Sequence, residues 1–493
     1  SYSVTGVQTC ALPILILNDN TMSISPNVGA LAKYLTNLIS NPTYNRIKSE
    51  IWDFTGRFEK MGPRIRRAAR KMEATLKGFV VPGILFERLG FRYFGPIDGH
   101  NISDLTNVLG EMREFNGPML LHVLTKKGRG YSPAEQNAPV FHGLGKFDKS
   151  TGQAIRASLV PTYTESFSQA MLDLAKTNPK MVGITAAMSL GTGLKKFADL
   201  YPERFFDVGI AEGHAVTFAA GMAIQGFRPV VAIYSSFLQR SYDHVLHDVA
   251  LQRLPVILAI DRAGLVGDDG PTHHGVFDLA FLRTIPHLVI MAPKDEEELR
   301  HMLHTALSYS EGPVAIRYPR GHGEGVAVSD EYKTLAIGKS ETVREGKHLA
   351  ILAVGPMVYR AMTAAELIEN TLGLSAQVIN VRFIKPVDRA MLEEVTGRFK
   401  LIITMEEGIN KGGFGSEVAE FLADEKLLEV ELVRRGLPDE FITQGDRPHL
   451  LDEAGLSPEA ILNAVESSHA VRTLKRTSTL KGLFRLNRKK KSA

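Results

Sequence analysis

The chain has 493 residues, 44% of them hydrophobic, and this length predicts two to four domains with sizeable cores. A single cysteine, Cys10, excludes an internal disulfide framework and any metal site built from several cysteines. No apolar run reaches about 18 residues, and the first residues lack the basic start of a signal peptide. We therefore predict neither a membrane span nor a secretion signal.

The net charge of +4 is an average over two unlike regions. Residues 471–493 contain nine Lys or Arg and no acidic residue, which leaves a net charge of −5 for the rest of the chain. We interpret residues 469–493 as a solvated basic tail, with binding to acidic lipid or nucleic acid as the alternative. The basic stretch Arg64–Lys71 lies in a segment that also contains acids, so we predict no nucleic-acid partner.

The first domain is expected at residues 15–147. Residues 1–14 are expected to be a leader foreign to the rest of the chain, an assembly or cloning artefact. Leu15–Asp19 is a short apolar run that ends in polar residues, a pattern typical of a central parallel strand with a ligand-facing end. Residues 42–80 are charge-rich with a helical pattern, which predicts a helical excursion from the sheet.

Two further strands are predicted in this domain. One begins at Phe91–Phe94, and the other extends over Pro118–Thr125. The second strand ends in the sequence KKGRGY. There Lys126, Lys127 and Arg129 offer cations, and the two glycines permit close backbone approach. This combination suits a bound diphosphate.

Residues 148–164 lose periodicity and predict a linker, and the second domain is expected at 165–325. Within it, Asp207–Gly275 alternates strand, small-residue helix, strand, amphipathic helix and strand, which predicts a parallel α/β unit. Glu212 stands where an apolar strand gives way to a helix rich in Ala and Gly. Partial desolvation would let this carboxylate hold or share a proton with a ligand nitrogen. The alternative is an acid that complements the helix dipole.

Polar and aromatic residues gather after successive strands of the second domain, where open parallel sheets place their ligands. Arg320 follows the last strand and could bind a substrate phosphate bidentately, with a surface salt bridge as the alternative. Two earlier strands, VVAIY and VILAI, are followed by Tyr234, Phe237 and Arg240 and by Asp261, Arg262, Asp269, His273 and His274.

A third domain is expected at 338–468, again with alternating strands and helices. Its glycine-rich segment GINKGGFG (Gly408–Gly415) resembles a phosphate loop, but close packing or a dimer contact is the preferred interpretation. We see no concentrated chemistry in this domain.

Five motifs of the second domain carry a resemblance to a known family. They are IAEGHAV, YSSFLQR, DRAG, GDDGPTHHG and RYPRG. Together they resemble the 1-deoxy-D-xylulose-5-phosphate synthase family, which are thiamine-diphosphate enzymes of the transketolase superfamily. The resemblance extends from about Leu15 to about Val465. It implies an α/β fold with three parallel-sheet α/β domains of transketolase type, the first one truncated.

The resemblance also implies the cofactors, thiamine diphosphate and Mg²⁺. A side-chain oxygen of Asn20 and the backbone carbonyl of Met22 are implied as magnesium ligands, and hard oxygen ligands suit that cation. Lys127 and Tyr131 are implied to lie beside the cofactor, and His142 is implied to reach the reaction centre.

In the second domain, the resemblance implies that Glu212 hydrogen-bonds the cofactor's aminopyrimidine ring and that Phe237 stacks on it. Arg262 and Arg320, with Tyr234, are implied to bind the substrate phosphate. The candidates for handling hydroxyl protons are Tyr234, Asp269, His273 and His142, and the sequence leaves the choice among them open.

The implied reaction joins pyruvate to D-glyceraldehyde 3-phosphate with release of carbon dioxide. It forms 1-deoxy-D-xylulose 5-phosphate for non-mevalonate isoprenoid, thiamine and pyridoxal biosynthesis. A homodimer in the bacterial cytoplasm is expected.

One departure from the family pattern concerns the first half of its cofactor motif. A Gly-Asp-Gly is expected about 25 to 30 residues before Asn20, and none precedes it here. We therefore expect this polypeptide alone to be inactive or nearly so. Two other hypotheses stay open. One is a non-catalytic fragment that dimerises or binds ligands, and the other is another enzyme of the superfamily, such as transketolase or the β subunit of a 2-oxoacid dehydrogenase.

Overall fold

A computed structural model describes residues 13–20, 22, 84–155 and 158–473. They belong to two compact units, Ser1–Ile155 and Arg156–Ala493, and each unit is described on its own. The predicted leader through residue 12, the helical excursion 42–80 and most of the basic tail lie outside the described residues. Within the described ranges, no helix combines the length and the apolar character needed to cross a membrane.

The first unit contains a small parallel sheet in the order β1-β3-β2. Its strands are β1 (Ile14–Asp19), β2 (Arg92–Asp98) and β3 (Met119–Leu124), which confirms the predicted strands. The prediction of a central first strand is wrong for the described residues, because there β1 pairs with β3 alone and lies at the sheet edge. Its residues Ile14, Leu15 and Ile16 are 42%, 49% and 53% exposed. Burial within this sheet therefore does not account for their apolar side chains.

Helix α6 (Ile102–Met112) packs on this small sheet through Leu105, Val108 and Met112. Its first turn is capped by Asn101, whose side chain accepts the backbone amide of Asp104. Among the described residues of this unit, the other helical segments are α5 (Ile84–Arg88), α7 (Ser132–Gln136) and the 3₁₀ turn Val140–His142.

The second unit holds a seven-stranded sheet in the order β13-β8-β9-β7-β6-β4-β5. All neighbours are parallel except β13, which pairs antiparallel with β8 at one edge. The strands are β4 (Met181–Thr185), β5 (Phe205–Asp207), β6 (Arg228–Tyr234), β7 (Ile257–Asp261), β8 (Val289–Met291), β9 (Val314–Arg317) and β13 (Phe383–Lys385).

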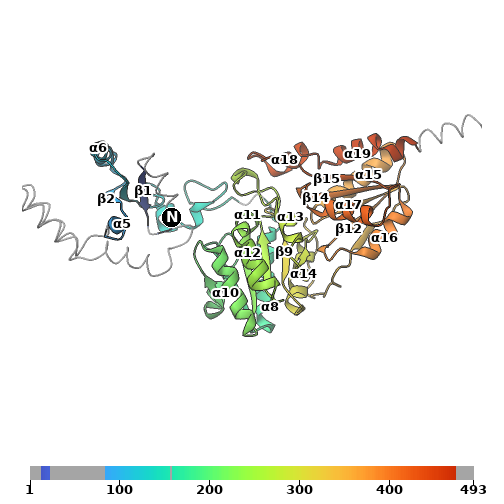
Figure 1. The fold of residues 1–493 in the computed structure, drawn as a ribbon, viewed down its shortest axis with the longest axis horizontal. Helices are drawn as coiled ribbons and strands as arrows, with labels where there is room; N and C mark the ends of the chain where they lie inside the picture. The colour runs from blue at the N-terminus through green and yellow to red at the C-terminus, as the bar shows by residue number, and fades with distance from the viewer. Residues whose placement is uncertain (1–12, 21, 23–83, 156–157, 474–493) are drawn as a thin grey trace, which may run out of the picture. The chain divides into compact units, whose positions relative to one another are not determined.

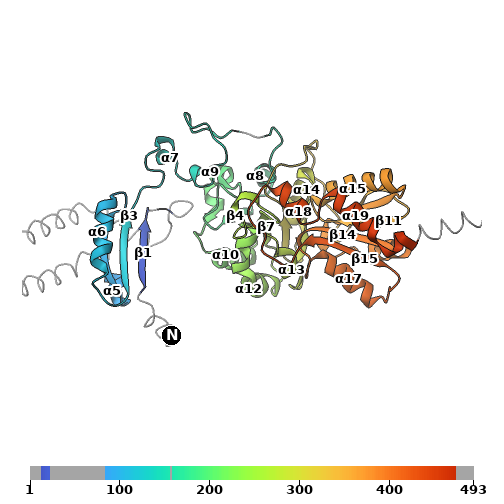
Figure 2. The same cartoon turned by 90° about the horizontal axis from the view of Figure 1, so that it is seen from above.

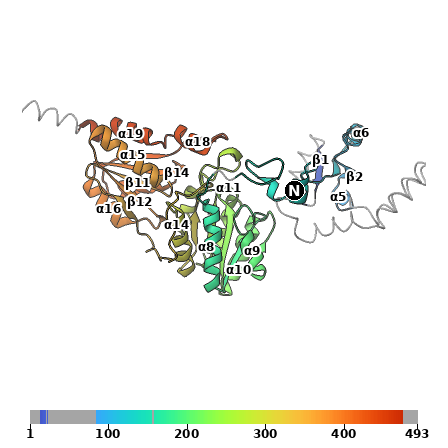
Figure 3. The ribbon, with the colours of Figure 1, turned by 180° about the vertical axis from the view of Figure 1, so that it is seen from behind.

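Both faces of this sheet are covered, which explains why its strands read as continuous apolar runs. Val230 and Ala232 of β6 point into a core with α8 (Tyr163–Thr177) and α14 (Glu296–Ser308), the neighbouring helices that can be followed in Figure 3. Val231 and Ile233 point to the opposite face, toward α10 (Glu212–Ile224) and α13 (Asp278–Arg283). This period-two alternation decides which face of the sheet each side chain covers.

The helix predicted after β6 is wrong as one continuous element. The structure divides it into α11 (Ser235–Leu238), the 3₁₀ turn Gln239–Ser241, α12 (Tyr242–His244) and a π-helical stretch, Val245–Ala250. Ser241 leaves the helical region with φ −115° and ψ 9° and so separates the segments. Such interruptions often accompany functional sites.

A five-stranded sheet follows in the order β10-β12-β11-β14-β15, with β10 antiparallel and the others parallel. Its strands are β10 (Glu341–Arg344), β11 (Leu349–Ala353), β12 (Ala376–Asn380), β14 (Leu401–Ile409) and β15 (Glu431–Leu437). One face packs on α15 (Met357–Leu372) and α19 (Pro458–Ser467), and the other on α16 (Arg389–Arg398) and α17 (Phe414–Asp424), as Figures 1 and 2 show.

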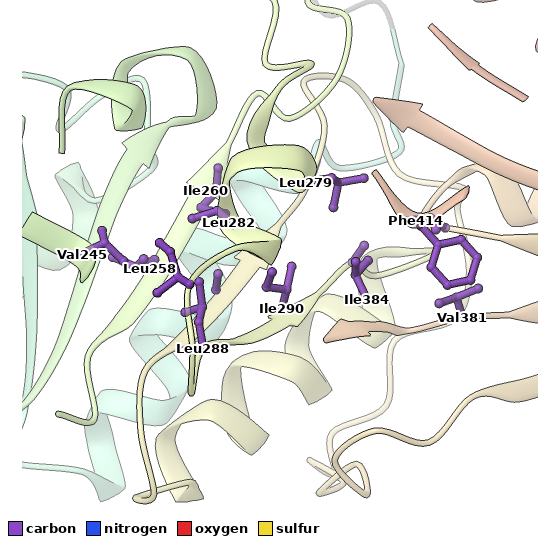
Figure 4. Close-up of a cluster of buried hydrophobic side chains, with 14 of the residues drawn as sticks. Val245, Leu258, Ile260, Leu279, Leu282, Leu288, Ile290, Val381, Ile384 and Phe414 are labelled. Carbon is purple, nitrogen blue, oxygen red and sulfur yellow. The ribbon is translucent and has the colours of Figure 1, made fainter. Parts of the chain in front are cut away.

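One apolar core continues from the seven-stranded sheet into the five-stranded sheet (Figure 4). Leu258 of β7 and Leu282 of α13 lie at one end of this cluster, and Val381 and Phe414 lie at the other. Because the core is shared, the two sheets of this unit are held to each other by buried side chains. The α/β prediction is confirmed, with an antiparallel edge strand in each of the two larger sheets.

Candidate active site

Glu212 begins α10 and is only 4% exposed, so the predicted desolvation of its carboxylate is observed. Its Oε1 accepts a hydrogen bond from Nη1 of Arg240 at 2.5 Å. No hydrogen bond reaches its Oε2 from the residues that the structure describes. One carboxylate oxygen at a helix start is therefore available to a ligand.

Aromatic rings link Glu212 to the rest of the site. The Arg240 guanidinium lies 5.0 Å from the ring centre of Phe237. Phe237 stacks on Tyr234 at 5.5 Å and meets the imidazole of His273 edge-on at 5.3 Å. The structure thus brings together five predicted residues from three strand ends: Glu212 after β5, Tyr234, Phe237 and Arg240 at the end of β6, and His273 after β7.

Tyr234 ends β6 and is nearly buried, and burial raises the pKa of its hydroxyl well above the usual value. The Arg262 guanidinium lies 3.8 Å above the tyrosine ring, a cation–π geometry that fixes both groups. Tyr234 therefore keeps its proton throughout the neutral pH range and can donate it in a hydrogen bond.

Arg262 is held by several groups at the end of β7. Its Nη1 lies 3.0 Å from Oδ2 of Asp261 and donates to the carbonyl of Gly191 at 2.7 Å. Asp261 is fully buried, and burial raises the pKa of this carboxyl against the opposing effect of Arg262. Thr164 Oγ1 donates to the same carboxylate at 2.8 Å. These contacts direct the guanidinium across the face of Tyr234.

Arg320 and Asp269 form an ion pair in which the two side chains are 36% and 41% exposed. Nη1 of Arg320 also donates to the carbonyl of Val266 at 3.0 Å. Asp269 lies in a 3₁₀ turn, Gly267–Asp269, and its loop continues to His273, whose Nδ1 lies 2.9 Å from Oγ1 of Thr272. An anionic substrate group would compete with Asp269 for this guanidinium.

His274 takes a different part from His273. It is buried, its Nδ1 accepts the amide of Val266 at 3.1 Å, and its Nε2 lies 3.2 Å from the carbonyl of Thr443. This pattern requires the Nε2–H tautomer and uses both ring nitrogens within the protein. His274 is thus a structural link and does not face the site.

Sequence reasoning missed two residues that shape this site, Gly191 and Thr164. A Cβ at Gly191 would stand 2.1 Å from the hydroxyl of Tyr234, so only glycine leaves room for that ring. Gly191 follows β4 in the sequence SLGTG, and its position after a parallel strand was the available signal. Thr164 was assigned to the linker, although it lies in the first turn of α8.

In the first unit, Lys127 and His142 lie together. Nζ of Lys127 is 2.6 Å from Nδ1 of His142, and burial lowers the pKa of the lysine. Tyr131 donates its hydroxyl proton to the carbonyl of Lys149 and packs edge-on against Phe141 at 5.6 Å. These residues form a second cluster of predicted ligand groups within their own unit.

The two predicted magnesium ligands are neighbours in space. Oδ1 of Asn20 accepts the backbone amide of Met22 at 3.0 Å, which orients the Asn20 amide just after β1. Across the described part of the chain, no group of three or more His, Cys, Asp or Glu side chains could hold a metal ion. A cation here would depend on the amide and carbonyl oxygens, together with phosphate or water oxygens.

The glycine-rich segment of the third domain is occupied by the protein itself. Glu406 accepts the backbone amides of Phe414 and Gly415, both at 2.8 Å, at the start of α17. A carboxylate from β14 thus takes the place that a phosphate would take in a phosphate loop.

The two larger α/β sheets and the polar and aromatic side chains gathered at the strand ends of the seven-stranded sheet define a protein of the transketolase type. Three family models match the chain: 1-deoxy-D-xylulose-5-phosphate synthase at residues 6–125, the transketolase pyrimidine-binding domain at 160–324, and the transketolase C-terminal domain at 338–461.

Curated relatives identify the family more closely. The 1-deoxy-D-xylulose-5-phosphate synthase of Pelotomaculum thermopropionicum is 52% identical over 93% of this chain and 72% of its own length. Those of Syntrophomonas wolfei and Geobacter sulfurreducens are 51% and 50% identical, over 92% of this chain and 70% and 71% of theirs. The chain belongs to the 1-deoxy-D-xylulose-5-phosphate synthase family.

Solved structures agree with the fold. A split-gene transketolase in an inactive beta4 tetramer aligns with a TM-score of 0.56 and 31% identity, over 63% of this chain and 98% of that one. The transketolase of Campylobacter jejuni aligns with a TM-score of 0.53 over 78% of this chain and 69% of that one, and at 15% identity it shows the shared fold.

Proposed function

We propose that this chain is a thiamine-diphosphate-dependent transferase that condenses pyruvate with D-glyceraldehyde 3-phosphate to 1-deoxy-D-xylulose 5-phosphate, releasing carbon dioxide. The observation that carries the proposal is the buried Glu212 carboxylate, with one oxygen on Arg240 and the other available, linked through Arg240 to the Phe237 ring. The name of the family supports the choice of reaction.

The residues around Glu212 fit the aminopyrimidine ring of the cofactor. Oε2 of Glu212 would hold or share a proton with a ring nitrogen, and Phe237 would stack on the ring. When bound, thiamine diphosphate supplies the carbon nucleophile that lets pyruvate lose carbon dioxide. Arg240 keeps Glu212 oriented, because it holds Oε1 in one direction.

We assign the phosphate of the aldehyde substrate to Arg262 and Arg320, with Tyr234 beside them. Arg320 is the more accessible cation, since its partner Asp269 is exposed and can yield to a dianion. Asp269 and His273 share one loop and are our candidates for moving hydroxyl protons, as is Tyr234, whose raised pKa suits a donor.

In the first unit we propose that Lys127 binds a diphosphate oxygen, that Tyr131 lies beside the cofactor, and that His142, now on Lys127, handles a substrate proton. Asn20 and the carbonyl of Met22 would supply two oxygens to Mg²⁺, which accepts phosphate and water oxygens for the rest of its shell.

We also propose a homodimer in the bacterial cytoplasm. Supporting the dimer, the second unit exposes large apolar side chains on and near α10: Ile210, Ile224, Phe227 and Leu251. Light scattering of the purified chain would give the mass of one or two copies.

The proposed reaction is tested by incubating the chain with thiamine diphosphate, Mg²⁺, labelled pyruvate and D-glyceraldehyde 3-phosphate, and detecting the five-carbon product by mass spectrometry. We expect product, at the low rate that the sequence analysis predicts, and about a 100-fold higher KM for the aldehyde in Arg320→Met. Arg389→Met, which removes an exposed ion pair far from these residues in the chain, is the control.

Two results would overturn the proposal. Transfer of a two-carbon unit between sugar phosphates without use of pyruvate would indicate transketolase activity. Because only a low rate is expected, the non-catalytic alternative would be supported by a folded chain that binds the cofactor and substrates and still forms no detectable product at high enzyme concentration.

A further inference from the structure

The loop that carries Asp269 and His273 is closed at its base. We call residues 264–275 the histidine loop. Gly264 and Gly275 exchange backbone hydrogen bonds at 2.7 and 2.8 Å, and inside the loop the amides of His273 and His274 both bond to the carbonyl of Gly270. The loop is therefore a compact unit whose position depends on what holds its outer side.

The outer side is held by the C-terminal domain. The amide of Leu265 donates to Oε1 of Glu407 at 2.9 Å. The amide of Gly445 lies 3.4 Å from the carbonyl of Gly267, and Nε2 of His274 lies 3.2 Å from the carbonyl of Thr443. Three groups from a domain without predicted chemistry thus contact the loop that carries two candidate catalytic side chains.

Glu407 is the charged group among these contacts, and it is 2% exposed. Arg447 binds its carboxylate with Nε at 3.0 Å and Nη2 at 2.5 Å. The backbone carbonyl of Glu407 accepts a hydrogen bond from Nη2 of Arg317 at 2.9 Å, and Arg317 lies three residues before Arg320. Glu407 therefore contacts both the histidine loop and the strand β9 that leads to the proposed phosphate ligand.

The loop backbone rests directly on this carboxylate. Gly264 has φ +85°, and a Cβ there would stand 2.4 Å from Cδ of Glu407. A side chain at this position would push the loop away from β14. The glycine and the glutamate together set the distance between the loop and the five-stranded sheet.

We propose that Glu407 is a positioning residue for the histidine loop, holding the Leu265 amide so that Asp269 and His273 stay directed at the substrate. The catalytic part of this proposal rests on the proposed function, while the structural part does not. Arg447 pairs with the Glu407 carboxylate and fixes its position, because a buried acidic side chain needs a partner.

The structural part is tested by hydrogen exchange of the full 493-residue chain without cofactor or substrate, followed in peptides that cover residues 262–277. Glu407→Ala removes the acceptor of the Leu265 amide, so we expect exchange in this segment to rise about 10- to 100-fold. Glu407→Gln keeps a side-chain oxygen for the amide and should raise exchange no more than about 10-fold.

Glu298→Ala is the matched control. Glu298 is an equally buried glutamate of α14 that binds Arg382 at 2.6 Å and Asn380 at 2.9 Å, and among the described residues it makes no hydrogen bond to the histidine loop. We expect exchange at 262–277 to stay within about twofold of the original chain. Unchanged exchange in Glu407→Ala, or an equal rise in Glu298→Ala, would overturn the proposal.

The catalytic part is read from the division between kcat and KM in the product assay. Glu407→Ala should lower kcat about 10-fold and leave the KM for D-glyceraldehyde 3-phosphate within about threefold, with partial recovery in Glu407→Gln. A rise in KM with unchanged kcat would contradict a role in directing Asp269 and His273. If exchange rises as expected but the original chain forms no product, the proposed reaction fails and the structural part of the inference stands.

Discussion

Glu212 and Glu406 both place a carboxylate at the start of a helix. Of the two, and within the described residues, only the carboxylate of Glu212 keeps an oxygen that accepts no hydrogen bond. Glu212 is the first residue of α10, and only one of its oxygens is used within the described chain, by Arg240. Glu406 comes from the preceding strand β14, and both of its oxygens accept amides at the start of α17. The first arrangement leaves an acceptor for a ligand, whereas the second satisfies the helix internally.

The comparison explains why glycine-rich turns are weak evidence for phosphate binding. In GINKGGFG a Cβ at Gly413 would stand 2.1 Å from Oε2 of Glu406, so the glycine makes room for an internal carboxylate. Around Glu212, in contrast, Gly191 makes room for the ring of Tyr234, which belongs to the site. Glycine thus makes room for an internal carboxylate beside one sheet and for a side chain of the candidate site beside the other.

The largest effect is expected at a buried ion pair between strand β9 and helix α13. Arg317 donates from Nε to Oδ2 of Asp278 at 2.9 Å, and both side chains are almost fully buried. Arg317→Met leaves Asp278 unpaired and should lower the free energy of unfolding by about 3–5 kcal/mol in urea denaturation.

The double variant Arg317→Met/Asp278→Leu should recover most of this loss, because it leaves no isolated charge. Arg389→Ala, at an exposed pair with Glu425, should stay within about 0.5 kcal/mol of the original chain. A loss below about 1 kcal/mol in Arg317→Met would show that this ion pair does not stabilise the fold.

The buried carboxyl group of Glu406 predicts that the free energy of unfolding depends on pH. Burial raises the pKa of Glu406 to about 7 from an ordinary 4.5, against the opposing effect of the Gly415 and Phe414 amides. Because the folded pKa is the higher one, this group's contribution is fully present below pH 4.5 and is lost as pH rises through about 7. This rise in pKa corresponds to a change of roughly 3 kcal/mol in the free energy of unfolding.

This dependence is measured as the free energy of unfolding at several pH values between 4.5 and 8, in the original chain and in Glu406→Gln. The variant cannot ionise, so the difference between the two chains should change in the variant's favour as pH rises. A difference that stays constant over this range would contradict the assignment.

The smallest of these effects concerns the open site. Gly191→Ala places a methyl group against the Tyr234 hydroxyl and should displace the ring from Arg262. We expect product formation to fall about 10-fold, with the thermal midpoint lowered by no more than a few degrees. Gly221→Ala, in α10 with open space around it, is the matched control. Equal activity in both variants would show that the position of Tyr234 is not critical.

Much of the fold and part of the site could be predicted from the sequence. Buried parallel strands such as β6 and β7 are continuous apolar runs, and the side chains that follow them meet at one sheet edge, as Tyr234, Phe237 and His273 do. Thr162 and Asp295 cap α8 and α14 and were available signals that we did not use, so the predicted linker 148–164 took in the first two residues of α8.

The contacts between distant segments could not be predicted. Nothing local in the sequence pairs Glu407 with Leu265, 142 positions away, or separates the buried His274 from the accessible His273. The interruption of the helix after β6 was also missed, because the break at Ser241 is set by tertiary packing and not by a proline or glycine.

The central claim is that Glu212 forms an open cofactor-ring site, and calorimetric titration with thiamine diphosphate and Mg²⁺ tests it most directly. The original chain and Glu212→Ala are compared, with Glu406→Gln as a control at the closed helix start. We predict binding by the original chain and by Glu406→Gln, and affinity at least about 100-fold weaker in Glu212→Ala, since a hydrogen bond to a buried charged group is lost. Equal affinity in all three chains, or no binding by a folded original chain, would contradict the account.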